Sequence, residues 1–180
     1  MPLYFLRHGQ SQANLNGLFA GQKENSPLTD LGRQQAQAAA KTLQDRHITT
    51  IVSSPLERAR ETAAIVAASL GIRDVSIDSR LAEYDMGALT GTPNKGKTVT
   101  SRELISAEGA EDPQLFQQRV LDAVAQYGAL PGAVVLVSHA GVGRVIEASK
   151  QGLAPDVFYD LPSYPNAQAV ELDIRWMSKR

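Results

Sequence analysis

The sequence contains no cysteine. This absence excludes disulfide bonds, thiolate zinc sites, iron–sulfur clusters and cysteine nucleophiles together. An excess of one charge is also missing, because 18 Lys and Arg residues stand against 19 Asp and Glu residues, for a formal net charge of −1. A nucleic-acid binder normally carries a clustered basic excess, so we expect no nucleic-acid partner.

Long hydrophobic runs are absent as well. No apolar stretch approaches the length of a membrane span. The short apolar run at the start is followed at once by Arg7 and His8, which is unlike a cleavable signal peptide. We therefore expect a cytoplasmic protein with no membrane partner.

The sequence does contain an alternation of strand-like and helix-like segments along its 180 residues. Its length and ordinary composition predict one globular domain over residues 1–180. Apolar or β-branched runs predict strands over residues 3–6, 48–52 and 133–137. Residues 170–176 alternate apolar and charged side chains, which favours a half-exposed edge strand, antiparallel to its neighbour.

Helices are predicted between these strands from their capping residues. Thr29 is placed to cap a helix over residues 31–44, and the segment Ser54-Pro55-Leu56-Glu57 has the pattern of a capping box. Further helices are expected to start at Asp112 and after the glycines Gly141 and Gly143. Together these elements predict an α/β fold, a three-layer α/β/α sandwich with a mostly parallel sheet.

Residues 84–111 fit neither pattern, because they are rich in glycine and show little periodicity. Loops of this length are often functional, so we interpret the segment as a surface excursion near a site. A floppy insertion without function is the alternative. Lys95, Lys97 and Arg102 in this segment hint at a second anionic group on a substrate, although they could also form a solvated loop face.

Two of the three histidines directly follow predicted strands. His8 comes after the first strand and His139 after the strand at 133–137. Open α/β sheets bind ligands beyond the carboxyl ends of their strands, so we expect both imidazoles at one site. Glycines follow each histidine and allow close approach of the backbone. A hydrogen-bonded histidine at a strand end is the alternative interpretation of His139.

Two arginines are predicted at the same place. Arg7 adjoins His8, and Arg58 lies in the first turns of the helix that follows the strand at 48–52. Guanidinium groups and helix amino termini together suit a phosphate dianion. Arg58 could instead pair with surface carboxylates, and Arg60 is then the competitor for the site.

An imidazole nitrogen is the best nucleophile available to this sequence, which points to His8. The leaving alcohol must gain a proton, and Glu83 is the natural carboxylic acid for that step, with Asp85 and Glu111 as alternatives. A metal site is not expected, because no His-x-His or His-x-x-x-His spacing occurs and the arginines would repel a cation.

Four segments in this order resemble the histidine phosphatase superfamily, also called phosphoglycerate-mutase-like, and most closely its phosphatase branch. The segments are RHGQSQAN, SSPLERARETA, LAEYDMGALTG and SHAG. The resemblance implies that His8 accepts the phosphate, that Arg7, Arg58 and His139 complete the phosphate pocket, and that Glu83 donates the proton. It further implies Asn14 as a phosphate ligand, places Gly21 and Gln22 near the bound group, and implies no metal or organic cofactor. Asn14 could instead only stabilise its own turn.

Three features bear on the choice between phosphatase and mutase. GALTG with Lys95 is similar to the mutase branch, whereas the short connection before the second histidine and Ala13, where mutases keep a tryptophan, favour a compact phosphatase. We therefore expect a metal-independent phosphomonoesterase that acts on a small phosphorylated substrate. A phosphoglycerate mutase and a non-catalytic phospho-ligand-binding domain are the alternatives. The oligomeric state stays open, with a homodimer that pairs the final strand across an axis as one possibility.

Overall fold

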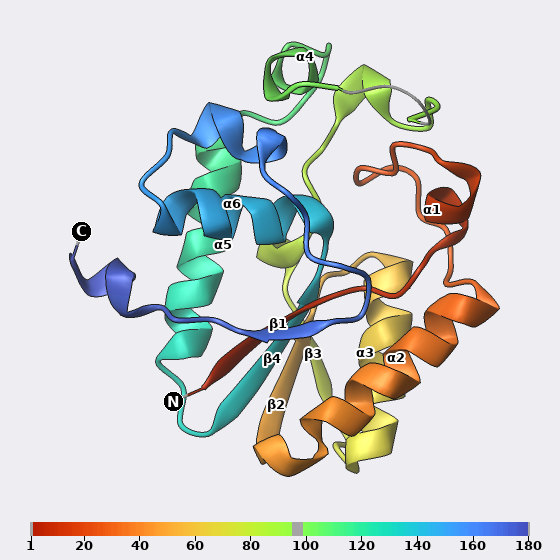
Figure 1. The fold of residues 1–180 in the computed structure, drawn as a ribbon, viewed down its shortest axis with the longest axis vertical. Coiled ribbons are helices and arrows are strands. Elements are labelled where there is room, and N and C mark those ends of the chain that lie inside the picture. The colour runs from red at the N-terminus through yellow and green to blue at the C-terminus, as the bar shows by residue number, and fades with distance from the viewer. Residues whose placement is uncertain (1, 95–98, 180) are drawn as a thin grey trace.

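A five-stranded sheet runs through the centre of the computed structural model, which describes residues 2–94 and 99–179 (Figure 1). Its strands are β1 (Leu3–Arg7), β2 (Ile48–Ser53), β3 (Val75–Ile77), β4 (Ala133–Ser138) and β5 (Ala169–Glu171). They are ordered β3-β2-β4-β1-β5, and β5 alone is antiparallel to its neighbour. The predicted mostly parallel sheet is therefore confirmed.

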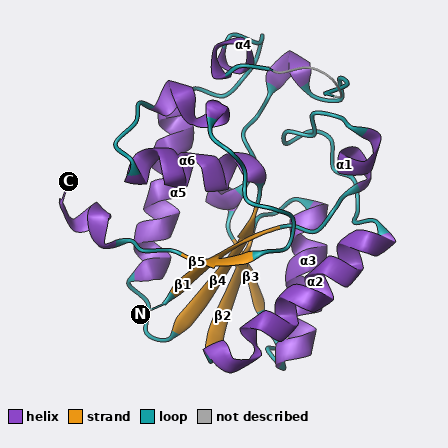
Figure 2. Ribbon diagram, in the orientation of Figure 1, coloured by secondary structure: helices purple, strands orange, loops and turns teal. Residues whose placement is uncertain are grey.

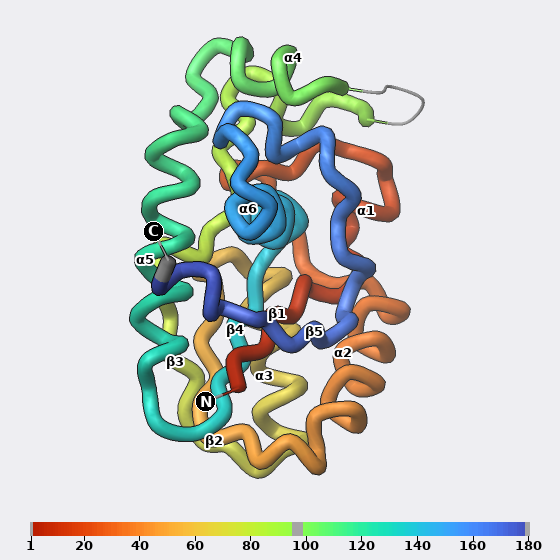
Figure 3. Tube along the Cα trace, turned by 60° about the vertical axis from the view of Figure 1, so that its left-hand side comes forward, coloured from red at the N-terminus to blue at the C-terminus, as the bar shows by residue number. Residues whose placement is uncertain are grey.

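Helices cover both faces of this sheet, which confirms the predicted three-layer sandwich (Figures 2 and 3). One face is covered by α2 (Asp30–Leu43) and α3 (Glu57–Leu70), and the other by α5 (Pro113–Gly128) and α6 (Ala140–Lys150). Two short helices, α1 (Gln12–Asn16) and α4 (Ser101–Ile105), lie beyond the carboxyl ends of the strands (Figure 1). No helix of the described residues is long and apolar enough to cross a membrane.

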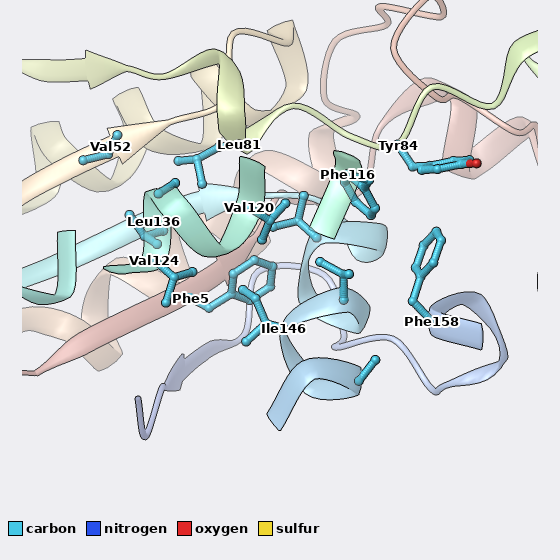
Figure 4. Packing of buried hydrophobic residues seen from close by; sticks show 14 of the residues in the cluster. Phe5, Val52, Leu81, Tyr84, Phe116, Val120, Val124, Leu136, Ile146 and Phe158 are labelled. Carbon is cyan, nitrogen blue, oxygen red and sulfur yellow. The ribbon is translucent and has the colours of Figure 1, made fainter. Parts of the chain in front are cut away.

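Alternate side chains of the central strands enter two separate cores. In β1, Leu3 and Phe5 join the core under α5 and α6, whereas Tyr4 and Leu6 join the core under α2 and α3. The first core is rich in aromatic residues from distant segments, as Figure 4 shows. The second is built largely from alanines, which let α2 and α3 approach the sheet closely. Because both faces are covered, β1 and β4 are nearly continuous apolar runs.

Most helix boundaries follow the capping residues predicted from sequence. The Thr29 hydroxyl accepts the amide hydrogen of Gly32, and the Asp112 carboxylate accepts those of Gln114 and Leu115. The capping box at Ser54 is wrong: α3 begins at Glu57, after Leu56, without a side-chain cap. The Ser54 hydroxyl instead lies within hydrogen-bonding distance of His139, the residue that follows β4.

Two strand predictions need correction. β3 was not predicted, because it has three residues and is mostly exposed, so it carries little hydrophobic pattern. The final strand is an antiparallel edge as predicted, but its ladder ends at Glu171 and the chain turns into a 3₁₀ helix at Arg175–Lys179.

The segment 84–111 is a packed excursion in its described part. Tyr84 and Leu104 are fully buried, and α4 begins with a capping box between Thr100 and Glu103. The amide of Ser101 donates to the Asp160 carboxylate at 2.8 Å, which ties α4 to the 3₁₀ helix at Pro155–Asp160. Lys95 and Lys97, considered above as substrate contacts, lie outside the described residues.

Candidate active site

A cleft of about 210 Å³ opens beyond the carboxyl ends of β1 and β4. Three arginines and one histidine line it, against a single carboxylate, Glu83. The lining side chains and backbone come from five separate parts of the chain: Arg7, His8, Asn14, Leu18, Phe19, Ala20, Gly21, Arg58, Glu83, Met86, Asn94, Ala140, Gly141, Arg144, Tyr159 and Ser163.

His8 lies directly after β1 and is 4% exposed. Its Nδ1 lies 2.6 Å from the carbonyl oxygen of Gly9. A carbonyl only accepts hydrogen bonds, so Nδ1 carries the proton and Nε2 holds the lone pair. Burial, followed by the charges of Arg58 and Arg7, lowers the pKa of His8 well below its ordinary value of 6.5. The ring is therefore neutral, with a nucleophilic Nε2.

Arg58 faces that nitrogen from the first turn of α3. Its Nε donates to Nε2 of His8 at 3.3 Å, and its two terminal nitrogens donate to the carbonyls of Glu24 and Gly21. The side chain is 1% exposed, and burial is the main reason that its pKa is lowered. Arg58 thus fixes the loop at 21–24 against the imidazole.

Arg7 enters the cleft from the end of β1. One terminal nitrogen donates to the carbonyl of Tyr164 at 2.8 Å and to the hydroxyl of Ser163 at 3.3 Å. Its Nε is buried without a partner among the described residues. Burial lowers the pKa of Arg7 as it does for Arg58. A buried, unpartnered N–H is costly, and an anion in the cleft would satisfy it.

His139 follows β4, and its ring centroid lies 5.2 Å from that of His8. Its Nε2 lies 2.7 Å from the Ser54 hydroxyl, which also accepts the amide hydrogen of Leu56. A hydroxyl can donate one hydrogen bond while it accepts others, and when the Ser54 hydroxyl donates its proton to Nε2, the hydrogen of His139 lies on Nδ1. This Nδ1 is buried without a partner among the described residues. Burial, with the charges of Arg58 and its neighbours, lowers the pKa of His139 well below 6.5.

Glu83 is held against the start of α6. Its carboxylate accepts the amide hydrogens of Tyr84, at 2.8 Å, and of Gly141, at 3.2 Å. A Cβ atom at position 141 would lie 2.3 Å from Glu83 Oε1, so only glycine permits this approach. A carboxylate has about four acceptor positions, and positions not used by these amides are free for a proton or a water molecule.

Of the other three predicted residues, Asn14 and Gly21 line the cleft and Gln22 does not. The Asn14 side chain lines it while its oxygen accepts the amide hydrogen of Ser11, so it also stabilises its own turn. Gly21 lines the cleft with φ near +52°, a conformation that glycine adopts readily. Gln22 does not line it: its amide donates to the backbone carbonyl of Glu83 at 2.8 Å.

The competing residues considered from sequence lie elsewhere. Arg60 is exposed and lines a separate hollow. Asp85 pairs with Lys23 at 3.6 Å, and Glu111 pairs with Arg119 at 2.7 Å. None of these three residues lines the cleft, whereas Arg58 and Glu83 do.

Sequence reasoning missed several residues of the site. Arg144 stands one helical turn after Ala140, so the spacing on one helix face was a usable signal. Tyr159 and Ser163 come from a segment without periodicity, and no local signal marks them. Ser54 was assigned to a helix cap, which its local pattern favours. Among the described residues, no three His, Asp or Glu side chains are grouped so as to hold a metal ion.

The sequence matches the family model of the histidine phosphatase superfamily (branch 1) over residues 3–178. A curated relative, the probable phosphoglycerate mutase GpmB of Salmonella choleraesuis (strain SC-B67), is 36% identical over 151 residues, which cover 77% of this chain and 69% of the relative.

Solved structures with the same fold include enzymes named as phosphatases. A mycobacterial glucosyl-3-phosphoglycerate phosphatase in complex with VO3 superposes with a TM-score of 0.82 at 31% identity, covering 96% of this chain and 92% of that one. A putative alpha-ribazole-5'-P phosphatase from Escherichia coli K-12 gives a TM-score of 0.76 at 27% identity, covering 97% and 91%.

Proposed function

Because the chain belongs to the histidine phosphatase superfamily (branch 1), we propose that it hydrolyses the phosphate ester of a small metabolite through a covalent phosphate on His8, without a metal ion. The observation that carries this proposal is the neutral imidazole of His8, whose proton is fixed on Nδ1 and whose Nε2 faces a cationic cleft. Attack on phosphorus requires an unprotonated nitrogen, and the lone pair of Nε2 becomes available when the donor Nε of Arg58 turns to a phosphate oxygen.

In the first step, Nε2 of His8 attacks phosphorus, and the bond from phosphorus to the ester oxygen breaks. Arg7, Arg58, the Nδ1–H of His139 and the amide of Asn14 bind the equatorial oxygens, over which charge spreads in the transition state. Glu83, in its protonated form, gives its proton to the leaving oxygen, which departs as a neutral alcohol.

The second step reverses these roles. Water enters where the alcohol left, and the carboxylate of Glu83 takes a proton from it as the water oxygen attacks phosphorus. The phosphorus–nitrogen bond breaks, inorganic phosphate leaves, and His8 returns to its neutral form. Every group that this cycle uses lies on the chain itself, so the reaction needs no cofactor.

Phosphoryl transfer to a second hydroxyl is the alternative, and the GpmB relative favours it. A mutase uses the same phosphohistidine but passes the phosphate to a sugar-acid hydroxyl instead of water. The neighbours named as phosphatases favour hydrolysis, since they cover more than nine-tenths of both chains.

The test is a panel of phosphate esters incubated with the protein in excess chelator, with inorganic phosphate and isomerised ester measured separately. Hydrolysis predicts release of inorganic phosphate from p-nitrophenyl phosphate and from at least one alkyl phosphate. Interconversion of 3- and 2-phosphoglycerate without phosphate release would identify a mutase. Binding without turnover would identify a phospho-ligand-binding domain, and activity that returns only with a divalent metal would contradict the metal-free mechanism.

A further inference from the structure

A turn shortly before β5 lies against the end of β1 and contacts residues of the proposed phosphate site. The backbone amide of Ala167 donates to the carbonyl of Arg7 at 2.9 Å. The side chain of Asn166, the residue before it, is within hydrogen-bonding distance of both His8 and Asn14. The reaction proposed above gives Asn166 no role, although it touches two of the groups that this reaction uses.

The orientation of the Asn166 amide follows from its partners. Its Nδ2 donates to the backbone carbonyl of His8 at 2.8 Å and to Oδ1 of Asn14 at 3.4 Å. A carbonyl only accepts hydrogen bonds, so the group that faces His8 is the NH2 and not the oxygen. An NH2 group has two hydrogens, one for each of these acceptors. Asn166 therefore connects the backbone of the nucleophile to the side chain of a proposed phosphate ligand.

The amide of Asn14 is oriented by the same contact. Its Oδ1 also accepts the backbone amide hydrogen of Ser11 at 3.2 Å, in the capping box of α1. Two donors on this atom identify it as the oxygen. The Nδ2 of Asn14 has no hydrogen-bond partner among the described residues, and the side chain lines the cleft. Rotation of the amide by 180° would break both bonds to the oxygen and turn an acceptor toward the phosphate.

The backbone of His8 is held by other contacts besides Asn166. The amide of Gly9 donates to the Thr62 hydroxyl at 3.1 Å, and this hydroxyl donates to a carbonyl one turn earlier in α3. The amide of His8 donates to a carbonyl at the end of β4 at 2.9 Å. Loss of Asn166 would therefore leave the nucleophile supported, whereas the Asn14 oxygen would keep only one of its two donors.

The turn that carries Asn166 has an unfavourable backbone conformation. Ala167 has a φ of +50°, in the left-handed region that residues with a Cβ atom rarely adopt. Such conformations persist where the surrounding structure holds them, and they are found preferentially at functional sites. The buried side chain of Ala167 and its hydrogen bond to Arg7 hold this turn against β1. The turn thus places Asn166 beside the nucleophile.

We infer that Asn166 is a positioning residue of the phosphate site, which acts through Asn14. It holds the oxygen of the Asn14 amide, so that the N–H donors of this amide stay available to a phosphate oxygen. The inference rests on the proposed function, in which Asn14 binds an equatorial oxygen, and adds the residue that orients this donor. Without Asn166, the Asn14 amide would spend part of its time with its oxygen toward the anion, which repels it.

A double-mutant cycle tests whether Asn166 acts through Asn14. Its four proteins are wild type, Asn14→Ala, Asn166→Ala and the double variant, and kcat and KM are measured with p-nitrophenyl phosphate. Asn166→Asp is added because it keeps the shape of the side chain but replaces the donor by an acceptor. Gln168→Ala is the matched control, since Gln168 is exposed two residues farther along the chain. Melting temperatures show which variants are folded.

Asn166→Ala should lower kcat of the otherwise wild-type protein about 5–10-fold, as for the loss of a single hydrogen bond. Asn14→Ala should cost about 100-fold or more, as for the loss of a donor to the transition state. In that background, Asn166→Ala should cost less than about 2-fold, because the group on which Asn166 acts is gone. Asn166→Asp should lose at least as much as Asn166→Ala, since a carboxylate attracts the Asn14 N–H donors away from the phosphate. Gln168→Ala should match wild type.

Equal losses from Asn166→Ala in the two backgrounds would overturn the inference, because a structural role would lower activity whether or not Asn14 is present. Wild-type kcat in a folded Asn166→Asp variant would overturn it as well. This second variant decides the question if Asn166→Ala does not fold.

The same proteins separate this inference from the proposed function. If wild type hydrolyses no phosphate ester, the proposed function fails, and calorimetric affinity for inorganic phosphate replaces kcat in the cycle. Asn166→Ala should then weaken phosphate binding when Asn14 is present and leave it unchanged in the Asn14→Ala background. Equal weakening in both backgrounds, or none in either, would overturn the role of Asn166 independently of hydrolysis.

Discussion

In the proposed reaction, His8 and His139 need opposite properties at the imidazole nitrogen that contacts the phosphate, although His139 is fully buried and does not line the cleft in this structure. His8 must present a lone pair, and His139 must present an N–H. The carbonyl of Gly9 fixes the first tautomer, and the second follows when the Ser54 hydroxyl donates its proton to Nε2 of His139. Both rings are neutral because burial, with the charges of neighbouring arginines, lowers their pKa values. The difference between nucleophile and donor is therefore set by one hydrogen bond on each ring.

Replacement of Ser54 by alanine should weaken catalysis through His139. Without the hydroxyl, Nε2 of His139 has no donor, and the tautomer with hydrogen on Nδ1 loses its support. We expect kcat for p-nitrophenyl phosphate to fall about 10-fold or more, as when a donor to the transition state is impaired. Ser54→Thr should recover most of the loss. The neighbouring variant Ser53→Ala, which removes a hydroxyl bonded to the backbone, is the control, and an equal loss there would refute the tautomer argument.

The loss of rate in a Glu83 variant should be larger for esters whose leaving oxygen needs a proton. Nitrophenolate leaves readily as an anion, whereas an alkoxide does not. In the first turnover, Glu83→Gln should slow transfer from an alkyl phosphate by about 10²–10⁴-fold. Transfer from p-nitrophenyl phosphate should slow much less, so a burst of nitrophenol should precede slow dephosphorylation. Asp85→Asn is the control acid, because it pairs with Lys23 away from the cleft. Equal slowing of both esters in the first turnover would give Glu83 a structural role instead.

At the scale of elements, the site lies where two strands end and two helices begin. β1 and β4 end directly before the two histidines, α3 begins at Glu57, directly before Arg58, and α6 begins against Glu83. Parallel strands bring their carboxyl ends to one edge of the sheet, which is why residues far apart in sequence lie in one cleft. Residues 84–94 and 99–111, the described part of the excursion, lie over this edge (Figure 1).

The contact between α6 and Glu83 predicts an unusual cost for a helix-favouring substitution. Alanine is preferred over glycine in helices by roughly 1 kcal/mol. In Gly141→Ala, however, the new Cβ would lie 2.3 Å from Glu83 Oε1 and displace the carboxylate. We expect kcat for an alkyl phosphate to fall about 10-fold or more. This loss is smaller than that for removing a general acid, because the carboxylate is displaced and not lost.

Gly128→Ala is the matched control, in the last turn of α5. Its Cβ would meet the flexible end of Ile174, which can move aside. Activity should stay at the wild-type level, and the melting temperature should hold or rise. If Gly141→Ala retains full activity on the alkyl phosphate, the position of Glu83 in this account is incorrect.

The elements that the sequence predicts well are those with long, regular patterns. The buried runs of β1 and β4, and the helix starts at Thr29 and Asp112, depend on local patterns that few tertiary contacts change. β3 escaped prediction because three mostly exposed residues carry almost no pattern.

The site residues that sequence reasoning missed depend on contacts between distant segments. Ser54 has the local pattern of a helix cap, but its hydroxyl bonds to His139, 85 positions away. Tyr159 and Ser163 reach the cleft only because the 3₁₀ helix at Pro155–Asp160 packs against α6. Histidines and arginines at strand and helix ends could be read from spacing, whereas these contacts need the folded chain.

At the scale of the whole molecule, two buried neutral imidazoles tie stability to pH. Their folded-state pKa values lie below the ordinary 6.5, so the unfolded chain binds protons that the folded chain does not. The contribution of the two neutral histidines to the free energy of unfolding therefore reaches its full value above about pH 6.5. It should fall as pH decreases below that point, by at most about 1.4 kcal/mol per pH unit for each histidine.

Urea unfolding between pH 5.5 and 7.5 measures this dependence. The double variant His8→Gln with His139→Gln should have a flatter profile than wild type below pH 6.5, whatever its absolute stability. His47→Asn, at an exposed position, should keep the wild-type slope. A wild-type profile that is flat down to pH 5.5 would show that the two rings are not held neutral.

The central claim is a phosphate carried covalently on Nε2 of His8, and a rapid-quench labelling experiment tests it most directly. Wild type, mixed briefly with ³²P-labelled p-nitrophenyl phosphate in excess chelator and quenched in alkali, should carry label that is stable to alkali and lost in acid. The label should map to the peptide with His8, reach its maximum before steady state, and be missing from a folded His8→Ala variant. Turnover in His8→Ala at the wild-type rate, or label on another residue, would contradict the account.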